Sequence, residues 1–332
     1  AAERTITMKL TKILSILVIG CTLALAGCGL RPSASVIPNL HPAAIQPVPG
    51  AEGKRVVITS KAFTEQLIMG KIAVYIADAA GFRATDMTGV PGSQPARKLL
   101  ESGQAQILYE YTGTAWLTYL GHETGIPDQK KQWQAVYEAD LANGLTWSNP
   151  TPLNNTYAFA VRREYAEQHH LTKLSDIASL PVSERTMCVD AEFNSRLDGL
   201  NPMLEKYGIP RGTPEGIPEK NISLMDTGTI YQATDTGACN LGEVFTTDGR
   251  IQSLDLVVLA DDRQYFPAYN AAPVFNSEFL AQYPEIADRF AQVTRLLDDD
   301  TMRSLNLKVD VDGADPGTVA LDWLVEQGFV SR

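Results

Sequence analysis

The sequence has few cysteines, no cluster of basic residues and low overall hydropathy. Four cysteines in 332 residues exclude a small protein built on a disulfide framework. A net charge of −11 with no Lys/Arg block argues against binding along a nucleic-acid backbone. A mean hydropathy of −0.11 excludes a polytopic membrane protein. What is present is an ordinary globular composition, 44% hydrophobic and 20% charged, in a chain long enough for about two domains.

Common catalytic and metal-binding motifs are also missing. The sequence contains no HExxH, GxSxG, P-loop or GxGxxG segment. It has no CxxC pair, and its four histidines show no ligand spacing with the cysteines: they are His41, His122, His169 and His170. We therefore expect no cofactor, no metal and no enzymatic activity.

A basic and apolar segment lies near the start of the sequence. Lys9 and Lys12 precede an apolar stretch over 13–26, which is shorter than the ~20 residues of a membrane span. The stretch ends in Leu25-Ala26-Gly27-Cys28, which resembles a bacterial lipobox. We predict that 1–27 is a signal peptide and that Cys28 is lipidated; a plain secretory signal or a short buried helix are the alternatives. The protein would then be exported and anchored to a bacterial membrane, either in a periplasm or on the outer face of the cell.

A proline-rich segment follows the predicted lipid anchor. Residues 28–53 contain five prolines and almost no periodic apolar pattern. Such a composition is typical of an extended tether. A tether would hold a folded body close to a membrane partner and raise its effective concentration there.

Two cysteines remain in the body, Cys188 and Cys239. Exported proteins fold in an oxidising compartment, so we predict that the two form a disulfide. The alternative is a pair of buried free thiols.

Predicted strands and helices alternate along the body. The apolar patterns predict strands over 55–59, 106–109, 157–161, 186–189, 241–246 and 254–259. They predict helices over 64–81, 94–102, 112–120, 164–170, 201–207, 230–236, 277–283, 284–297, 298–306 and 316–327. Alternation of this kind indicates an α/β fold with mostly parallel sheets. Ligands of such sheets bind where strands end and helices begin, which points to 60–66, 92–93 and 110–114.

Six segments of the body form a series of motifs. They are Ser60-Lys61-x-Phe63-Thr64-Glu65-Gln66, Tyr109-Glu110-Tyr111-Thr112-Gly113-Thr114, Asn155-Thr156-Tyr157-Ala158, Phe193-x-x-Arg196-x-Asp198-Gly199, Thr246-Thr247-Asp248-Gly249 and Asp261-Asp262-x-x-x-Phe266-Pro267-x-Tyr269-Asn270. In order and spacing over 54–332 they resemble the substrate-binding proteins of ABC importers for glycine betaine, choline and related osmoprotectants.

The resemblance implies the two-lobed periplasmic-binding-protein fold of type II, in which each lobe is a sheet flanked by helices and the ligand lies in the interlobe cleft. Lobe one would comprise 54–155 plus 261–332, and lobe two 156–260. The protein would be a monomer that delivers a small quaternary amine or betaine to an ABC permease in the membrane.

The resemblance also implies a binding site. Its aromatic cage would be Tyr111, Tyr157, Phe245 and Tyr269, and its carboxylate clamp Lys61, Thr114 and Arg196. A trimethylammonium group offers no N–H donor, so rings must recognise it by shape and cation–π attraction, while the fork of an arginine suits a carboxylate. A cationic ligand would face Lys61 and Arg196 unpaired, which favours a ligand with a carboxylate.

Several alternatives stay open at this point. Relatives usually carry tyrosine where this chain has Phe245, and Tyr231 is a nearby ring that could compensate. Taken singly, the cage tyrosines could be ordinary sheet residues, Lys61 a solvated loop residue and Arg196 a partner of Asp198 or Glu192. The same fold could bind another small amine or an uncharged solute. It could also be an enzyme using a carboxylate pair from among Glu110, Asp190, Glu192 and Asp198.

Overall fold

The computed structural model describes residues 37–126 and 128–332. Within them, residues 39–332 form one compact unit, whereas the predicted signal peptide and Cys28 lie outside the described residues. No helix of the described ranges is both long and apolar enough to cross a membrane.

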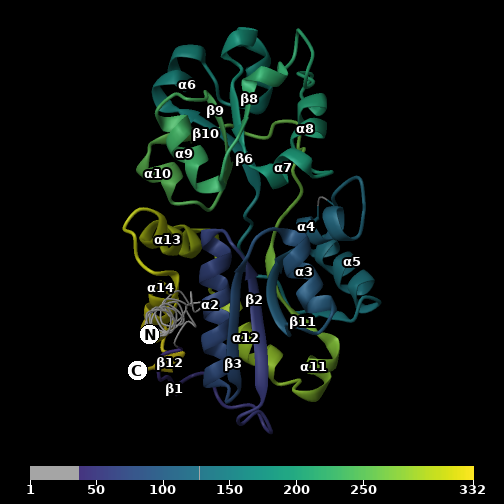
Figure 1. Ribbon diagram of the computed structural model, residues 1–332, viewed down its shortest axis with the longest axis vertical. Helices are drawn as coiled ribbons and strands as arrows, with labels where there is room; N and C mark the ends of the chain where they lie inside the picture. Colours follow the sequence, from purple (N-terminus) through teal and green to yellow (C-terminus); the bar gives the residue numbers. More distant parts are fainter. Residues whose placement is uncertain (1–36, 127) are drawn as a thin grey trace, which may run out of the picture. The chain divides into compact units, whose positions relative to one another are not determined.

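The described chain forms two five-stranded sheets, each with its own helices, which we call the first and second lobes (Figure 1). The first sheet has the order β3 (Arg83–Val90), β2 (Arg55–Lys61), β4 (Ile107–Tyr111), β11 (Ala271–Asn276) and β5 (Leu145–Trp147). The second has the order β10 (Leu256–Val258), β6 (Tyr157–Arg162), β9 (Leu241–Phe245), β7 (Met187–Val189) and β8 (Ile222–Leu224).

The helices divide between the lobes in the same way. The first lobe contains α2 (Thr64–Ala79), α3 (Ser93–Glu101), α4 (Thr112–Thr114), η1 (Ala115–Tyr119), α5 (Gln129–Leu141), α11 (Ser277–Gln282), α12 (Ile286–Thr294), α13 (Asp299–Asp310) and α14 (Pro316–Glu326). The second contains α6 (Arg163–His169), η2 (Leu174–Ser179), η3 (Val182–Glu184), α7 (Ala191–Ser195), α8 (Leu200–Lys206), η4 (Glu219–Asn221), α9 (Thr227–Asp235) and α10 (Arg250–Ser253).

The sheets are mixed, so the expectation of mostly parallel sheets is wrong. The central strands pair in parallel, β2 with β3 and β4, and β7 with β8 and β9. The antiparallel partners are β6 and β11, the strands that the chain enters directly after crossing from one lobe to the other. A strand entered this way has no crossover helix before it, and antiparallel pairing needs none. The two crossings meet in a bridge between Asn154 and Asn270.

Helix α2 packs tightly on the first sheet and brings its N-terminus to the end of β2. Its buried face includes Ile68 and Ile72, which are fully buried in the first lobe's core. At Gly70 the helix approaches the sheet so closely that a Cβ atom would lie 2.7 Å from Thr88 Cγ2. Without a side chain at this position, the helix can lie directly against the sheet. The loop over 61–63, which joins β2 to α2, is therefore held between two elements in close contact.

Several elements were not predicted from the sequence, among them β3, β11 and α5. Strand β3 is half polar, and β11 contains Pro273, a residue that usually argues against a strand inside a sheet. Helix α5 did leave a signal, since Asp128 is a typical N-cap and accepts a hydrogen bond from the Lys131 N–H at 2.8 Å.

The segment predicted as a tether is partly folded. His41–Pro42 forms strand β1, which pairs antiparallel with β12 (Val330–Ser331). Beyond it Ile45, Val48 and Ala51 are buried in the body. These apolar residues anchor the chain between the prolines, so the prediction of an extended tether through residue 53 is wrong for 41–53.

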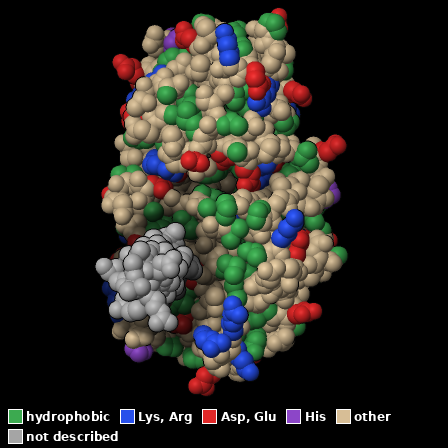
Figure 2. Space-filling model, viewed as in Figure 1, with side chains coloured by type: hydrophobic (Ala, Val, Ile, Leu, Met, Phe, Trp, Pro, Cys, Tyr) green, Lys and Arg blue, Asp and Glu red, His purple; other side chains and the backbone are tan. Residues whose placement is uncertain are grey.

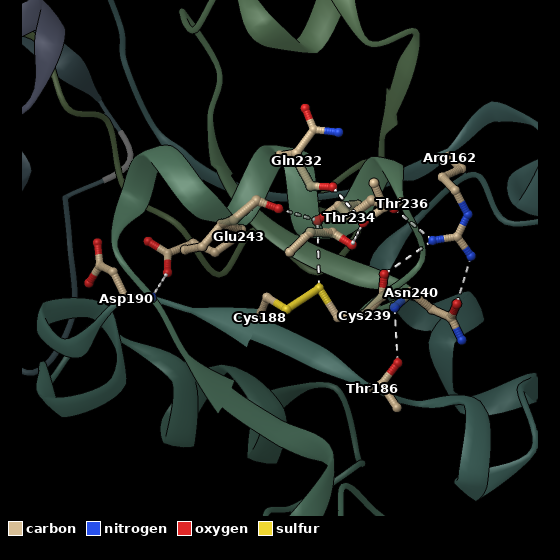
Figure 3. The surroundings of a disulfide bond; sticks show 12 residues. Arg162, Thr186, Cys188, Asp190, Gln232, Thr234, Thr236, Cys239, Asn240 and Glu243 are labelled. Atoms are coloured by element: carbon tan, nitrogen blue, oxygen red, sulfur yellow. Dashed lines mark hydrogen bonds between the residues drawn. A yellow bond between two sulfur atoms is a disulfide. The ribbon is translucent and has the colours of Figure 1, made fainter.

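A disulfide joins Cys188 of β7 to Cys239, which precedes β9 (Figure 3). Both cysteines are buried and pack with Ile230 and Ala233 of α9. The bond therefore ties α9 and the loop after it to the centre of the second sheet.

We expect the double variant Cys188→Ala/Cys239→Ala to fold with reduced stability. The bond closes a loop with a sequence separation of 51, and opening a loop of that size costs about 4 kcal/mol by chain entropy. Urea unfolding of the oxidised protein and the double variant measures this difference. Equal stability of the two proteins would contradict a structural role for the bond.

Candidate ligand-binding site

A cavity of about 400 Å³ lies between the lobes, where strands of both sheets end. Each residue that the sequence analysis assigned to the site lines it: Lys61, Tyr111, Thr114, Tyr157, Arg196, Phe245 and Tyr269. Figure 2 shows acidic and basic side chains gathered along the boundary between the two lobes. Among the described residues no group of three or more His, Cys, Asp or Glu side chains could hold a metal ion.

Strand ends position these side chains. Lys61 and Tyr111 are the last residues of β2 and β4, whose carboxyl ends meet at one edge of the first sheet. In the second sheet, Tyr157 begins β6 and pairs with Phe245 at the end of β9. Residues far apart in the sequence therefore converge on the cavity.

Aromatic rings form a continuous arc along the cavity wall. The arc begins with Tyr111 and Phe63, whose ring centroids are 6.1 Å apart, and continues from Phe63 to Phe245 at 5.3 Å. Phe245 lies 5.4 Å from Tyr157, which meets Tyr269 edge-on at 5.7 Å. Phe63 was missed as a site residue, although it stands within the Ser60–Gln66 motif, at the N-cap of α2.

Lys61 is buried and paired with a carboxylate. Its ammonium lies 2.5 Å from Glu110 Oε1 and 5.1 Å from the centroid of the Tyr111 ring. Glu110 also accepts hydrogen bonds from the Tyr111 N–H and from the Tyr119 hydroxyl. The alternative of a solvated loop lysine is therefore wrong, because Lys61 is only 4% exposed.

Arg196 is likewise paired. Its Nε and Nη2 donate to the two oxygens of Asp198 at 2.7 and 2.6 Å, and its Nη1 donates to Glu192 at 3.1 Å. Its guanidinium lies 5.3 Å from the centroid of the Tyr157 ring. The expectation that Lys61 and Arg196 would stand unpaired against a cationic ligand is thus wrong, and it no longer favours a ligand with a carboxylate.

Tyr231 supports Phe245 from behind rather than replacing the missing hydroxyl in the cavity. The Phe245 N–H donates to the Tyr231 hydroxyl at 3.0 Å. Tyr231 is buried, is absent from the cavity wall, and has the guanidinium of Arg250 at 4.1 Å over its ring.

Glu65 connects the cavity wall to both lobes. It accepts hydrogen bonds from the Tyr111 hydroxyl at 2.7 Å, the Asn155 amide at 2.9 Å, the Thr247 hydroxyl at 2.5 Å and the Asn306 amide at 3.3 Å. Burial raises the pKa of Glu65, while these donors oppose the rise. One carboxyl group therefore ties together a ring of the cavity, a crossing segment, the second lobe and α13.

Two neighbouring carboxyl groups, Asp190 in the cavity wall and Glu243 behind it, lie near the disulfide (Figure 3). Asp190 lines the cavity, caps α7 by accepting from the Phe193 N–H, and donates its own N–H to Glu243 Oε2 at 2.7 Å. Glu243 is 2% exposed, and its Oε1 has no hydrogen-bond partner among the described residues. Burial and the neighbouring Asp190 raise the pKa of Glu243 well above 4.5, and burial raises that of Asp190.

Comparison with known proteins places the chain in a family. Residues 54–326 match the substrate-binding domain of the ABC-type glycine betaine transport system. The chain is 39% identical to a glycine-betaine-binding protein of Pseudomonas aeruginosa, over 83% of this chain and 89% of that protein. It is 29% identical to the glycine betaine-binding protein YehZ of Escherichia coli, over 82% of this chain and 91% of that protein.

A solved structure agrees with this relationship. The crystal structure of a glycine betaine/carnitine/choline ABC transporter covers 82% of this chain and 99% of its own at 29% identity, with a TM-score of 0.67. The chain belongs to this family of substrate-binding proteins and has its two-lobed periplasmic-binding-protein fold of type II. It is a transport protein rather than an enzyme.

We expect the stability of the protein to fall as the pH rises above the usual carboxyl range, because of Glu243. A carboxyl whose pKa is raised by folding stabilises the folded state at low pH, and this contribution is lost as the pH rises through the folded-state pKa. For Glu243 the loss begins near its ordinary value of 4.5 and extends well above it. The variant Glu243→Gln should show a smaller fall.

Urea unfolding at pH 4.5, 6 and 8 measures this difference. Glu219→Gln is the control, since Glu219 is exposed and the Arg211 guanidinium lowers its pKa. That variant should show no smaller fall than the unmodified protein. An unchanged pH profile in Glu243→Gln would contradict the assignment.

Proposed function

We propose that the protein binds a quaternary-ammonium compatible solute of the glycine betaine type in the interlobe cavity and delivers it to an ABC permease. The observation that carries the proposal is the arc of rings from Tyr111 to Tyr269, which can surround a methylated ammonium group. Each ring contributes ~0.5–2 kcal/mol by cation–π attraction, depending on desolvation. Micromolar affinity needs about −8 kcal/mol, which several rings together with shape complementarity can supply.

The two ends of the cavity have different roles in this proposal. Tyr111, Tyr157, Phe245 and Tyr269, with Phe63 added, hold the ammonium group. Lys61, Thr114 and Arg196 form the polar end, which faces the remainder of the ligand. Polar groups at a defined distance from a cage fix the orientation of the bound solute.

Ligand binding would close the two lobes, which we propose follow the division 54–155 plus 261–332 and 156–260. Side chains of both lobes line the cavity, so a ligand contacting both favours the state in which they are together. Cross-lobe hydrogen bonds supplement these contacts, from Tyr269 to Asp198 and from Thr247 to Glu65. The loaded monomer then docks on the membrane permease.

We expect Tyr111→Ala and Tyr157→Ala each to weaken binding of choline and glycine betaine by about two- to thirtyfold without unfolding the protein, the range that corresponds to the contribution of one ring. Phe63→Ala should have an effect of the same kind. Titration calorimetry measures the affinities, and Tyr137→Ala is the control because Tyr137 packs against Trp133 outside the cavity.

Two results would overturn the proposal. Unchanged affinity in both tyrosine variants would exclude the cage, and a thermal shift with uncharged solutes but none with quaternary amines would exclude the ligand class. Binding of a small amine that lacks methyl groups would favour the alternative of a different amine as the natural ligand.

We further propose that the protein is exported and anchored through a lipid on Cys28. The support is the lipobox-like Leu25-Ala26-Gly27-Cys28 after a basic and apolar leader. Expressed in a bacterium, the protein should fractionate with membranes, whereas Cys28→Ala should move to the soluble fraction. The same distribution for both proteins would exclude the anchor.

A further inference from the structure

The carboxylate of Glu192 lies at the polar end of the cavity. The residue lies in the first turn of α7, lines the cavity, and has a side chain that is 32% exposed. Its carboxylate accepts hydrogen bonds from the backbone N–H of Ser93 at 3.3 Å, from the Ser93 hydroxyl, and from Arg196 Nη1 at 3.1 Å. Ser93 begins α3 of the first lobe, so this contact also crosses between the lobes.

The surroundings keep this carboxylate ionised. Although burial opposes ionisation, the nearby Lys61 ammonium, the Ser93 hydrogen bond and Arg196 together lower the pKa of Glu192. Glu192 thus occupies the set of donors that a carboxylate of a bound ligand would otherwise use.

The basic residues of the cavity need no carboxylate from the ligand as a partner. Lys61 already has Glu110 as its partner, and Arg196 has both oxygens of Asp198. Glu192 adds a further negative charge to these two neutral pairs, and Asp190 and Asp226 also line the cavity, so its acidic residues outnumber its basic ones. A cation entering the arc of rings compensates that charge, whereas a zwitterion leaves it in place and brings a second carboxylate close to it.

Thr114 provides an uncharged group for the ligand's polar end. Its side chain lines the cavity and is 4% exposed. Within the described chain its hydroxyl makes no hydrogen bond, so it is available to a hydroxyl group of the ligand.

We propose that Glu192 is the specificity-determining residue of the cavity: its carboxylate selects quaternary-ammonium ligands that carry no carboxylate of their own. This inference rests on the proposed function in assuming that a quaternary amine binds in the arc of rings, and within that ligand class it favours choline-like cations over glycine betaine itself. A zwitterion must displace Glu192 from Ser93 and Arg196, or lie beside it against like-charge repulsion. A cationic alcohol such as choline neither displaces Glu192 nor brings a second negative charge close to it.

Titration calorimetry with choline and with glycine betaine tests the proposal. The unmodified protein should bind choline more tightly. Glu192→Gln removes the charge and keeps the size of the side chain, so it should shift the affinity ratio toward glycine betaine by about tenfold or more. Glu219→Gln is the matched control, because Glu219 also pairs with an arginine, Arg211, but lies away from the cavity; it should leave the ratio unchanged.

A second variant separates selectivity from lobe closure. Ser93→Ala removes the hydroxyl that bonds to Glu192 across the lobes but keeps the charge. It should weaken both ligands and shift their ratio toward glycine betaine by less than Glu192→Gln does, because the charge remains and only one of its hydrogen bonds is lost; a shift as large as that of Glu192→Gln would contradict the role of the charge. Circular dichroism confirms that each variant is folded.

The outcomes distinguish this inference from the proposed function. If both ligands bind and Glu192→Gln leaves their ratio unchanged, or if the unmodified protein prefers glycine betaine, the role of Glu192 is overturned while the cage stands. If neither quaternary amine binds the unmodified protein, the proposed function itself fails.

Discussion

The arrangement of the cavity depends on one constraint: a positive charge removed from water must have a negative partner. Lys61 and Arg196 are both nearly buried, and each is held by a carboxylate of its own lobe, Glu110 and Asp198 respectively. Because each cation is neutralised by its own carboxylate, neither needs an anionic ligand as a partner, and both are held in place in the cavity wall. Recognition is left to ring faces, the Thr114 hydroxyl and the carboxyl groups of the wall, among which Glu192 is the one that contacts Arg196.

A second group of hydrogen bonds connects the cavity wall to the rest of both lobes. Glu65 receives donors from a cage tyrosine, a crossing segment, the second lobe and α13. The Tyr269 hydroxyl donates to Asp198, so a residue next to the other crossing reaches the partner of Arg196. Ring positions and lobe positions are therefore set by the same hydrogen bonds. A change in the angle between the lobes must alter the cage at the same time.

The sequence was sufficient to predict the convergence of Lys61, Tyr111 and Tyr157, because these residues stand at strand ends in motifs with family spacing. The pairing of Arg196 with Asp198 or Glu192, left open as an alternative, is confirmed, because these residues are close in sequence. The pairing of Lys61 with Glu110 could not be predicted, since the two are 49 positions apart and nothing local links them. The mixed direction of the strands was missed for a related reason. Strand β11 contains Pro273, so it was not predicted, and its antiparallel pairing with β4 is a contact between residues far apart in the sequence. Lobe boundaries and ligand roles remain predictions.

Strands β1 and β12 join the two ends of the compact unit in one antiparallel pair. Both ends of that unit therefore lie on the first lobe, and the second lobe contains neither. An attachment through the N-terminal segment would fix the first lobe and leave the second to swing on the two adjacent crossings at Asn154 and Asn270. If the lobes close on the ligand as proposed, the place of attachment would decide which lobe stays still relative to the membrane, and closure would be a movement of the second lobe.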